Sequence, residues 1–140
     1  MKLLETKDYI VPASSETPFV RISKKQKLVE IRGKSLAKTS KEFYCSLESK
    51  VKELECSSCD IEVELFIEYF NTPSSKGCFN LLRTLELMQK VGTRTSVKWY
   101  VEADDWDMRE IGEDYRSLLS LQNFQIIEVE ENPDEMFAIA

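Results

Sequence analysis

The sequence contains no histidine among its 140 residues. This absence excludes the Ser–His and Cys–His pairs of nucleophilic catalysis and every acid–base scheme that uses an imidazole. It also removes the commonest protein ligand of zinc and iron. An enzyme built on this sequence would have to work with carboxylates, lysine or a bound metal. We therefore predict a protein with no catalytic residues, no metal and no cofactor.

Long apolar runs are also absent. The chain has no apolar stretch of about 18 residues, so no membrane insertion is predicted. Its first residues lack the apolar core of a signal peptide, and we expect a cytoplasmic protein. The net charge of −6 disfavours nucleic-acid binding, because a phosphate backbone requires a surface rich in lysine and arginine.

Cysteine is scarce, with four residues at positions 45, 56, 59 and 78. Cys56 and Cys59 form one CxxC motif, but it follows a helical pattern and precedes a strand. A redox-active CxxC motif follows a strand and opens a helix, and a zinc site needs a second pair of ligands. We therefore predict ordinary reduced thiols in a loop.

The hydrophobic pattern predicts one domain of the α/β class. Alternating residues on both sides of the polar turn 24–27 indicate a β-hairpin. Further strands are expected over 61–70, 95–101 and 124–129, and helices around 43–54, 78–88 and 108–118. The order β-β-α-β-α-β-α-β predicts a mixed sheet flanked by helices. The expected divisions are a loose lead-in (1–16), the domain (17–130) and an acidic tail (131–140).

The helix starts carry two further expectations. Thr39 and Glu42 match a capping box, and Thr72 followed by Pro73 matches an N-cap followed by the first helical residue. Gly112 lies inside the third predicted helix, where glycine is unfavourable by about 1 kcal/mol relative to alanine. We expect that this helix closely approaches another backbone there.

One candidate site surrounds Thr72. The segment from Asn71 to Lys76 contains three hydroxyl side chains and one cation. One interpretation is a helix start and nothing more. The other is an anion or phosphate site, because free N–H groups at a helix N-terminus attract negative charge and Lys76 adds to this attraction. The segment has no glycine-rich phosphate loop, so nucleotide binding is not expected.

The second candidate site is the acidic segment after the strand 95–101. It contains Glu102, Asp104, Asp105, Asp107 and Glu110. Such carboxylates can hold Mg²⁺, or they can simply favour the start of a helix. If the preceding strands are parallel neighbours, this segment should touch the Thr72 segment at one edge of the sheet.

Several motifs resemble the SiaC family of bacterial regulatory phosphoproteins. The resemblance covers roughly residues 15–130 and rests on Tyr69-Phe70-Asn71-Thr72-x-Ser74-Ser75-Lys76, Val97-Lys98-Trp99-Tyr100, Asp104-Asp105-x-Asp107-Met108-x-Glu110-x-Gly112-Glu113-Asp114-Tyr115, Thr17-Pro18-x-Val20 and Gly33-x-Ser35. The sequence departs from the family pattern at Pro73, where serine is common, and at residues 36–38, where Leu-Ala-Lys replaces Pro-Glu-Asn.

The resemblance implies a fold like that of anti-anti-sigma (STAS-like) proteins and a partner-switching function controlled by phosphorylation of Thr72. It further implies a protein kinase, a PP2C-type phosphatase and an effector bound by the unphosphorylated chain, with a diguanylate cyclase as the candidate. The expected partner-binding residues are Asn71, Thr72, Ser74, Ser75, Lys76, Asp104, Asp105 and Asp107. The alternative is a Mg²⁺-dependent receiver-like or small hydrolytic domain that uses the Asp104–Asp107 carboxylates. Asn71 disfavours it, because an acid is expected where that strand ends.

Overall fold

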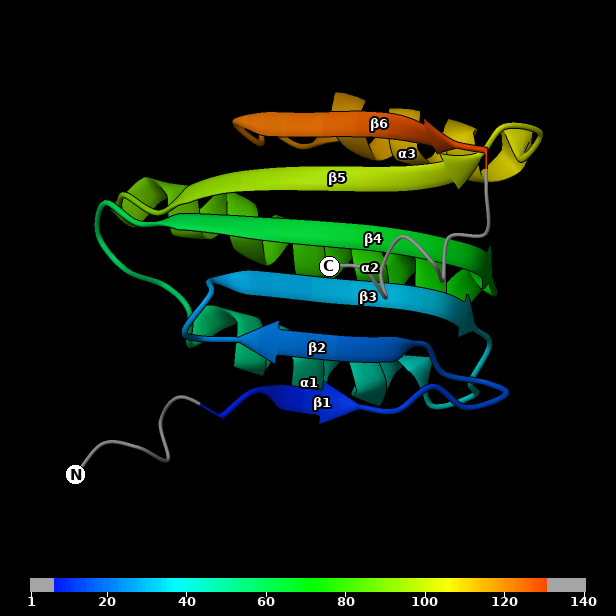
Figure 1. Ribbon diagram of the computed structural model, residues 1–140, viewed down its shortest axis with the longest axis horizontal. Helices are drawn as coiled ribbons and strands as arrows, with labels where there is room; N and C mark the ends of the chain where they lie inside the picture. Colours follow the sequence, from blue (N-terminus) through cyan, green and yellow to red (C-terminus); the bar gives the residue numbers. More distant parts are fainter. Residues whose placement is uncertain (1–6, 131–140) are drawn as a thin grey trace.

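A computed structural model describes residues 7–130, and in this range it forms one mixed sheet with helices (Figure 1). The predicted acidic tail, 131–140, lies outside the described residues. The strands are β1 (Tyr9–Val11), β2 (Phe19–Ser23), β3 (Leu28–Ser35), β4 (Asp60–Phe70), β5 (Arg94–Glu102) and β6 (Asn123–Val129). The helices are α1 (Ser40–Lys52), α2 (Thr72–Met88), the 3₁₀ helix η2 (Gln89–Val91) and α3 (Trp106–Leu118).

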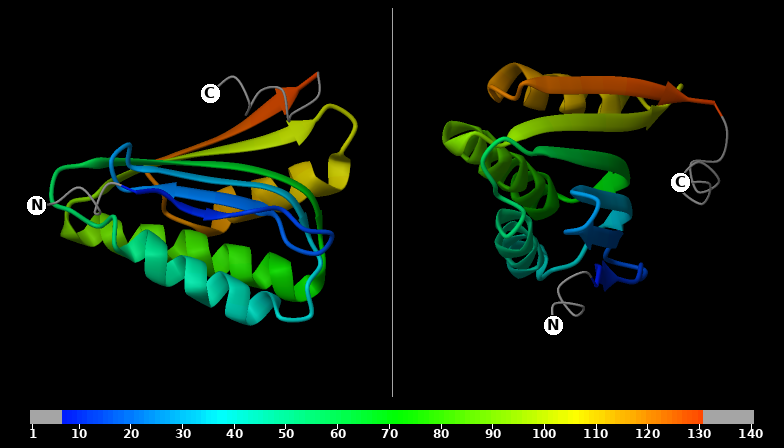
Figure 2. Two further views of the ribbon diagram at one scale, coloured as in Figure 1. Left: turned by 60° about the horizontal axis from the view of Figure 1, so that its bottom comes forward. Right: turned by 60° about the vertical axis from the view of Figure 1, so that its left-hand side comes forward.

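The strand order in the sheet follows the sequence, from β1 to β6. β2 pairs antiparallel with both β1 and β3, whereas β3, β4, β5 and β6 are parallel. Each β–α–β connection therefore moves one strand in the same direction across the sheet. Right-handed crossovers then bring α1, α2 and α3 to the same face, as Figure 2 shows. The described part of the chain is thus a two-layer structure with one open sheet face.

Most sequence predictions of secondary structure are confirmed. The hairpin is β2–β3, and the three later strands and three helices occur in the predicted order. The lead-in prediction is wrong for Tyr9–Val11, which forms β1 at the edge of the sheet. Three residues are too few to show a period, and this strand is fixed by pairing with β2 and by the ion pair of Asp8 with Arg21 at 3.0 Å.

The hydrophobic core lies between the sheet and the helices. Trp99 is 1% exposed at its centre, and its indole N–H donates to the Met108 carbonyl oxygen at 3.1 Å. A Cβ atom on Gly112 would lie 2.5 Å from this indole ring. The close approach that the sequence predicts at Gly112 is therefore confirmed, but the neighbour is the Trp99 side chain and not a backbone.

Among residues 7–130, no helix combines the length and the apolar character needed to cross a membrane.

The CxxC loop lies between α1 and β4. The prediction of reduced thiols is wrong in this structure, which joins Cys56 and Cys59 by a disulfide. Ser58 has a positive φ of 63° and turns the loop, so the two Cα atoms are 5.8 Å apart, a separation typical of disulfides. Hydrogen bonds of the loop to the η2–β5 segment also hold it: the Thr93 hydroxyl donates to the Cys56 carbonyl at 2.7 Å, and Arg94 N–H donates to the Cys59 carbonyl at 2.8 Å.

Replacing Cys56 and Cys59 together by serine is expected to preserve the fold. The bridge closes a loop of only four residues, so its loss should lower the free energy of unfolding by about 2 kcal/mol at most. Thermal unfolding of the double variant checks this, with Cys45→Ser, at an exposed free thiol, as the control. Stoichiometric zinc in protein purified without a chelator would show instead that the pair serves as a metal site.

Candidate functional site

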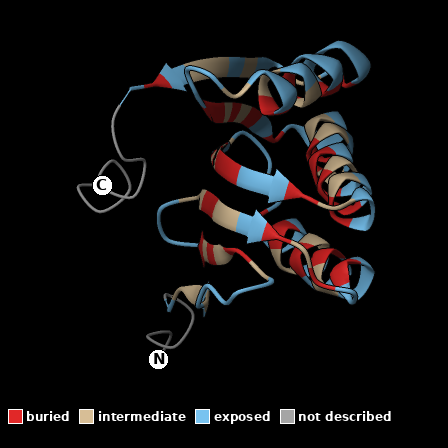
Figure 3. Ribbon diagram, turned by 90° about the vertical axis from the view of Figure 1, so that its right-hand side faces the viewer, coloured by how far each residue is buried: buried red, intermediate tan, exposed pale blue. Residues whose placement is uncertain are grey.

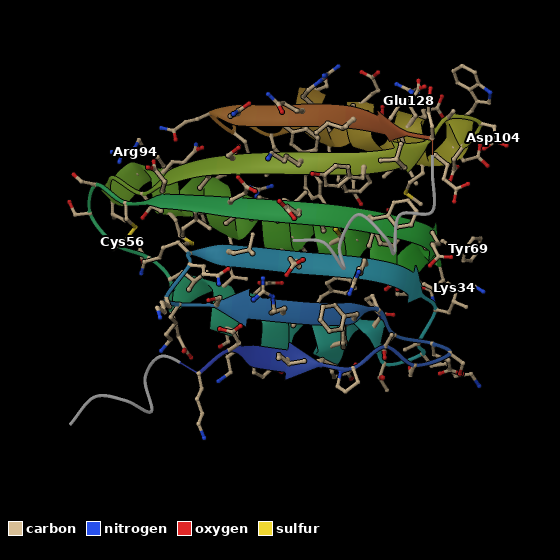
Figure 4. All side chains as sticks on the ribbon, in the orientation of Figure 1. Lys34, Cys56, Tyr69, Arg94, Asp104 and Glu128 are labelled. Atoms are coloured by element: carbon tan, nitrogen blue, oxygen red, sulfur yellow. A yellow bond between two sulfur atoms is a disulfide. The ribbon has the colours of Figure 1, made fainter. Side chains whose placement is uncertain are left out.

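The Thr72 segment and the acidic segment both lie beyond the carboxyl ends of the parallel strands. Figure 4 shows Lys34, Tyr69 and Asp104 at this edge of the sheet, and Cys56 and Arg94 at the opposite edge. In open parallel sheets the carboxyl edge is the usual place of a functional site. The predicted parallel pairing of β4 with β5 is confirmed.

The N-cap of α2 is Asn71. Its side-chain oxygen accepts a hydrogen bond from Ser74 N–H at 2.9 Å, so Thr72 is the first helical residue and Pro73 the second. The prediction of Thr72 as the cap is therefore wrong by one position. Pro73 still fits, because its missing N–H would have no helical partner in the first turn. Thr72 therefore does not cap the helix.

A buried serine pair anchors this helix start. Ser74 is 0% exposed, and its hydroxyl lies 2.7 Å from that of Ser40, which donates to the Ala37 carbonyl at 2.6 Å. The Asn71 backbone N–H also donates to the Ser35 carbonyl at 3.1 Å. The structure thus corrects two predictions. Ser74 cannot contact a partner through its side chain, and the predicted capping box fails because Thr39 makes no side-chain cap.

Thr72 itself is exposed. Within the described residues its hydroxyl makes no hydrogen bond, in contrast to the hydroxyls of Ser74 and Ser75. Lys76, also exposed, follows four residues later and so lies on the same side of α2. Thr72 therefore presents an accessible hydroxyl on a rigid helix start, with one cation a turn away.

A groove of about 570 Å³ runs between α2 and α3, with Thr72 in its wall. Most of its surface is apolar, and its apolar residues are Phe70, Phe79, Ile111 and Leu118. Its polar members are Asn71, Thr72, Ser75, Lys76, Asp114 and Tyr115. Leu118 is 69% exposed, which is unusual for a large apolar residue that serves only the core. Such a groove can receive an apolar side chain of another protein.

Tyr115 of α3 connects the two walls of the groove by hydrogen bonds to Ser75 of α2. Its hydroxyl lies 3.0 Å from the Ser75 hydroxyl and also donates to the Ser75 carbonyl oxygen. Burial raises the pKa of Tyr115, with the nearby Cys78 acting in the same direction, so its hydroxyl remains a hydrogen-bond donor. Edge-on contacts of its ring with Phe79 and Trp99 fix its position.

The acidic segment does not line this groove. Asp105 is the N-cap of α3, since its carboxylate accepts from Met108 N–H at 3.1 Å, while Asp104 and Asp107 are exposed. The acid that does line the groove is Asp114, from the middle of α3. Within residues 7–130, no three carboxylates or cysteines converge as metal ligands would. Nothing in this geometry favours the Mg²⁺-dependent alternative.

Trp106 lies within the acidic segment and is 70% exposed. Arg109 stands 5.8 Å from its ring centre and forms an ion pair with Glu128 on β6. Exposed tryptophans are common anchors of protein–protein contacts. Trp106 therefore makes the carboxyl edge more apolar than its aspartates alone indicate.

Several site residues could not be recognised in the sequence. Ile111, Tyr115 and Leu118 match a helical repeat that predicts burial, yet Leu118 faces solvent and Ile111 is half-buried. Their role depends on how α3 lies against α2. The exposure of Leu118 at the end of the apolar stripe has no signal in the sequence itself.

Replacing Asn71 by alanine is expected to lower the free energy of unfolding by about 1 kcal/mol, because the cap of α2 is lost. Thr72→Ala should change it by less than about 0.5 kcal/mol, because the Thr72 hydroxyl has no bond to lose. Chemical denaturation of both variants checks the assignment. A larger loss of unfolding free energy for Thr72→Ala than for Asn71→Ala would show that Thr72 caps the helix, as the sequence predicted.

Comparison with known proteins matches this fold and the site motifs to one family. The model for "SiaC family regulatory phosphoprotein" matches residues 11–129. SiaC of Pseudomonas aeruginosa is similar in structure, with a TM-score of 0.79 at 22% identity over 88% of this chain and 99% of that one. A search of curated proteins finds no match.

Two further structures are similar. One is the diguanylate cyclase SiaD of P. aeruginosa in complex with its activator SiaC, where the matched chain has a TM-score of 0.80 at 23% identity and covers 87% of this chain and 100% of that one. The other is apo-SiaC of the same organism, with a TM-score of 0.77 at 24% identity over 86% of this chain and 98% of that one.

Proposed function

Because this chain belongs to the SiaC family of regulatory phosphoproteins, we propose that it is a non-enzymatic switch whose state is set by reversible phosphorylation of Thr72. In the unphosphorylated state it binds an effector protein. The observation that carries this proposal is the position of Thr72, an exposed residue in the wall of an apolar groove.

Phosphorylation would act locally. A phosphate adds a charge of about −1.5 to −2 and three acceptor oxygens to a surface built around a neutral hydroxyl. The N-terminus of α2 and Lys76 favour this charge, whereas Asp114 across the groove opposes it. Because Asn71, Ser74 and Ser40 already fix the helix start, little refolding is needed. The change that a partner meets is one of charge and shape.

The effector would bind over the groove and the neighbouring carboxyl edge of the sheet. From the predicted set, Asn71, Thr72, Ser75 and Lys76 line the groove, and Asp104 and Asp107 extend the surface beside Trp106. Asp105 contributes by holding the start of α3. A diguanylate cyclase is the candidate effector, since the SiaC of P. aeruginosa is described as the activator of one.

The remaining partners follow from the same function. A protein kinase would phosphorylate Thr72, and a PP2C-type phosphatase would restore the hydroxyl, with all partners in the cytoplasm. Pro73 directly follows the acceptor and lies in the first turn of α2, so the kinase must accept a rigid residue there. The relation to anti-anti-sigma (STAS-like) domains belongs to this proposal as well.

Affinity capture from host lysate tests the function. Thr72→Val, which keeps the shape and removes the acceptor, should retain the effector, and Thr72→Asp should lose it. Thr84→Asp is the matched control, because it adds the same charge to α2 twelve residues, or about 18 Å, further along. Equal capture by all three variants, or a phosphosite found only on Ser75, would contradict the proposal.

A further inference from the structure

The CxxC loop lies at the opposite edge of the sheet from the Thr72 segment. Figure 4 shows Cys56 at this edge, and Figure 3, which faces the carboxyl edge, has the loop on its far side. Of the four cysteines, Cys45 and Cys78 are free, whereas Cys56 and Cys59 are joined. The proposed switch uses neither member of this pair. The loop therefore carries a chemistry, thiol–disulfide exchange, that is independent of phosphorylation.

The fold holds this loop in shape without help from the bridge. The carbonyl oxygens of Cys56 and Cys59 accept hydrogen bonds from the η2–β5 segment. In addition, the Ser58 N–H donates to the Gly92 carbonyl at 3.0 Å, and the Arg94 guanidinium donates to the Ser58 carbonyl at 3.1 Å. These bonds use backbone atoms of the loop and no sulfur atom. Breaking the S–S bond should therefore leave the path of the loop in place.

The structure also accommodates the reduced form of the pair. The Cys59 sulfur lies 3.5 Å from the Cys56 carbonyl oxygen and 4.0 Å from that of Leu54. In the disulfide this sulfur has no hydrogen to donate, but a thiol is a weak donor and these two oxygens can accept from it. Both cysteines are partly exposed, so another thiol or disulfide can reach them. The loop is therefore compatible with both oxidation states.

The bridge belongs to the class of disulfides that are easily exchanged. It closes a loop of four residues, and short loops gain the least stability from a bridge. Because the bridge stabilises the fold only weakly, the fold in turn stabilises the bridge only weakly. Exposed disulfides are more readily reduced than buried structural ones and include the regulatory ones. Reduction can therefore occur in the folded protein.

The charges around the pair indicate a substrate of thiol–disulfide exchange and not a catalyst of it. Each cysteine has an acid beside it in the sequence, Glu55 or Asp60. The helix α1 ends at Lys52, so the negative end of its dipole lies toward the loop. Arg94, which contacts the loop, forms an ion pair with Asp60 at 2.5 Å. Negative surroundings disfavour a thiolate, so the attacking thiolate must come from another molecule.

We propose that the Cys56–Cys59 pair is a redox modification site, reduced by a protein dithiol and re-formed by a small disulfide such as glutathione disulfide. In reduction, a thiolate of the dithiol attacks the Cys56 sulfur, the Cys56–Cys59 bond breaks, and Cys59 leaves and takes up a proton. The second thiol of the dithiol then attacks the mixed disulfide and releases the Cys56 thiol. Two electrons and two protons pass from the dithiol to the pair.

Re-formation of the bridge runs through the same kind of intermediate. The Cys56 thiol, after loss of its proton, attacks glutathione disulfide and forms a mixed disulfide, and one glutathione leaves. Cys59 then attacks the Cys56 sulfur, closes the bridge and releases the second glutathione. The two electrons of the pair are thereby transferred to the glutathione disulfide.

Reduction should loosen the loop and leave the rest of the fold unchanged. Ser58 has a φ of 63°, in the left-handed region that is unfavourable for residues other than glycine. Without the bridge, only hydrogen bonds such as that to the Gly92 carbonyl keep Ser58 in this conformation. The loop should then open more often, and the Ser58 amide proton should exchange faster with water. The start of α2, at the other edge of the sheet, should not respond.

Counting thiols in the full chain tests this proposal. Cys45→Ser serves as the background, because it removes the exposed free thiol that would otherwise take up glutathione. The folded protein is equilibrated with glutathione buffers, quenched in acid, unfolded and alkylated, and mass spectrometry counts the modified cysteines. Only Cys78 should be modified after the disulfide-rich buffer, and all three cysteines after the thiol-rich buffer. Return to the first buffer should restore the first count, with an unchanged circular dichroism spectrum throughout.

Dithiothreitol is the dithiol probe, and it should reduce the pair faster than glutathione at the same thiol concentration. The matched control carries Cys56→Ser and Cys59→Ser in the same background and should show one modified cysteine in every buffer. A pair that stays joined in the thiol-rich buffer, or whose reduction unfolds the protein, would show a structural bridge and overturn the proposal. A pair that stays reduced, or only binds glutathione, in the disulfide-rich buffer would overturn it as well.

Discussion

Thr72→Asp is expected to weaken effector binding by a factor of about a hundred or more, whereas Thr72→Val keeps the affinity of the unmodified chain. The carboxylate would stand in the wall of an apolar groove that Phe79, Leu118 and Asp114 also line. A partner that covers the groove would have to bury this charge, and Lys76 is the only cation among the described residues that line the groove. Burying a charge without adequate pairing costs several kcal/mol, and about 2.7 kcal/mol already corresponds to a hundredfold loss.

Calorimetric titration of the purified effector, identified by its capture with Thr72→Val, measures this difference. Thr84→Asp controls for the added charge on α2, and the melting temperature of each variant controls for folding. Retention of full affinity by Thr72→Asp would place the effector on another surface. Loss of affinity in Thr72→Val would instead show that the effector requires the hydroxyl itself.

Gly112→Val is expected to destabilise the protein by about 3 kcal/mol and to lower its melting temperature by about 10 °C. A Cβ at this position would lie 2.5 Å from Trp99 Cδ1 and 2.6 Å from Nε1. The indole cannot move aside, because it is 1% exposed, bonded to the Met108 carbonyl and packed against Tyr115. The helix must shift instead, which disturbs the groove that α3 lines.

Thermal unfolding followed by circular dichroism checks the effect of Gly112→Val. Glu110→Val is the matched control, since it introduces the same β-branched residue at an exposed position of α3. The contact with Trp99 is measured by the difference between the two variants in their free energy of unfolding. A difference below about 1 kcal/mol would mean that the core can accommodate the added atoms.

The sequence predicted the strands and helices well because their patterns are local. β4 and β5 have long apolar runs, and their parallel pairing followed from the helix between them. β1 was missed because a three-residue edge strand depends on its neighbour and not on its own pattern. The one-residue error at the start of α2 arose because Asn71 and Thr72 are both good caps, and only the backbone conformation decides between them.

The candidate site was predicted only in part, because its residues come together through contacts between distant segments of the chain. The sequence grouped Thr72 and Lys76 with the acids Asp104–Asp107, whereas the acid that lines the groove together with Thr72 and Lys76 is Asp114. The ends of adjacent strands do not lie level: β4 continues four residues beyond Phe66, which pairs with Tyr100, and β5 continues two beyond Tyr100. The burial of Ser74 likewise depends on Ser40, which is 34 residues away. Such long-range placements have no local pattern in the sequence.

The most direct test of the switch is a calorimetric comparison of the unmodified chain with a chain that carries phosphothreonine only at position 72. Both are titrated with the purified effector under the same conditions. We expect tight binding by the unmodified chain and a loss of affinity by a factor of about a hundred or more on phosphorylation. Equal dissociation constants for the two chains would contradict it.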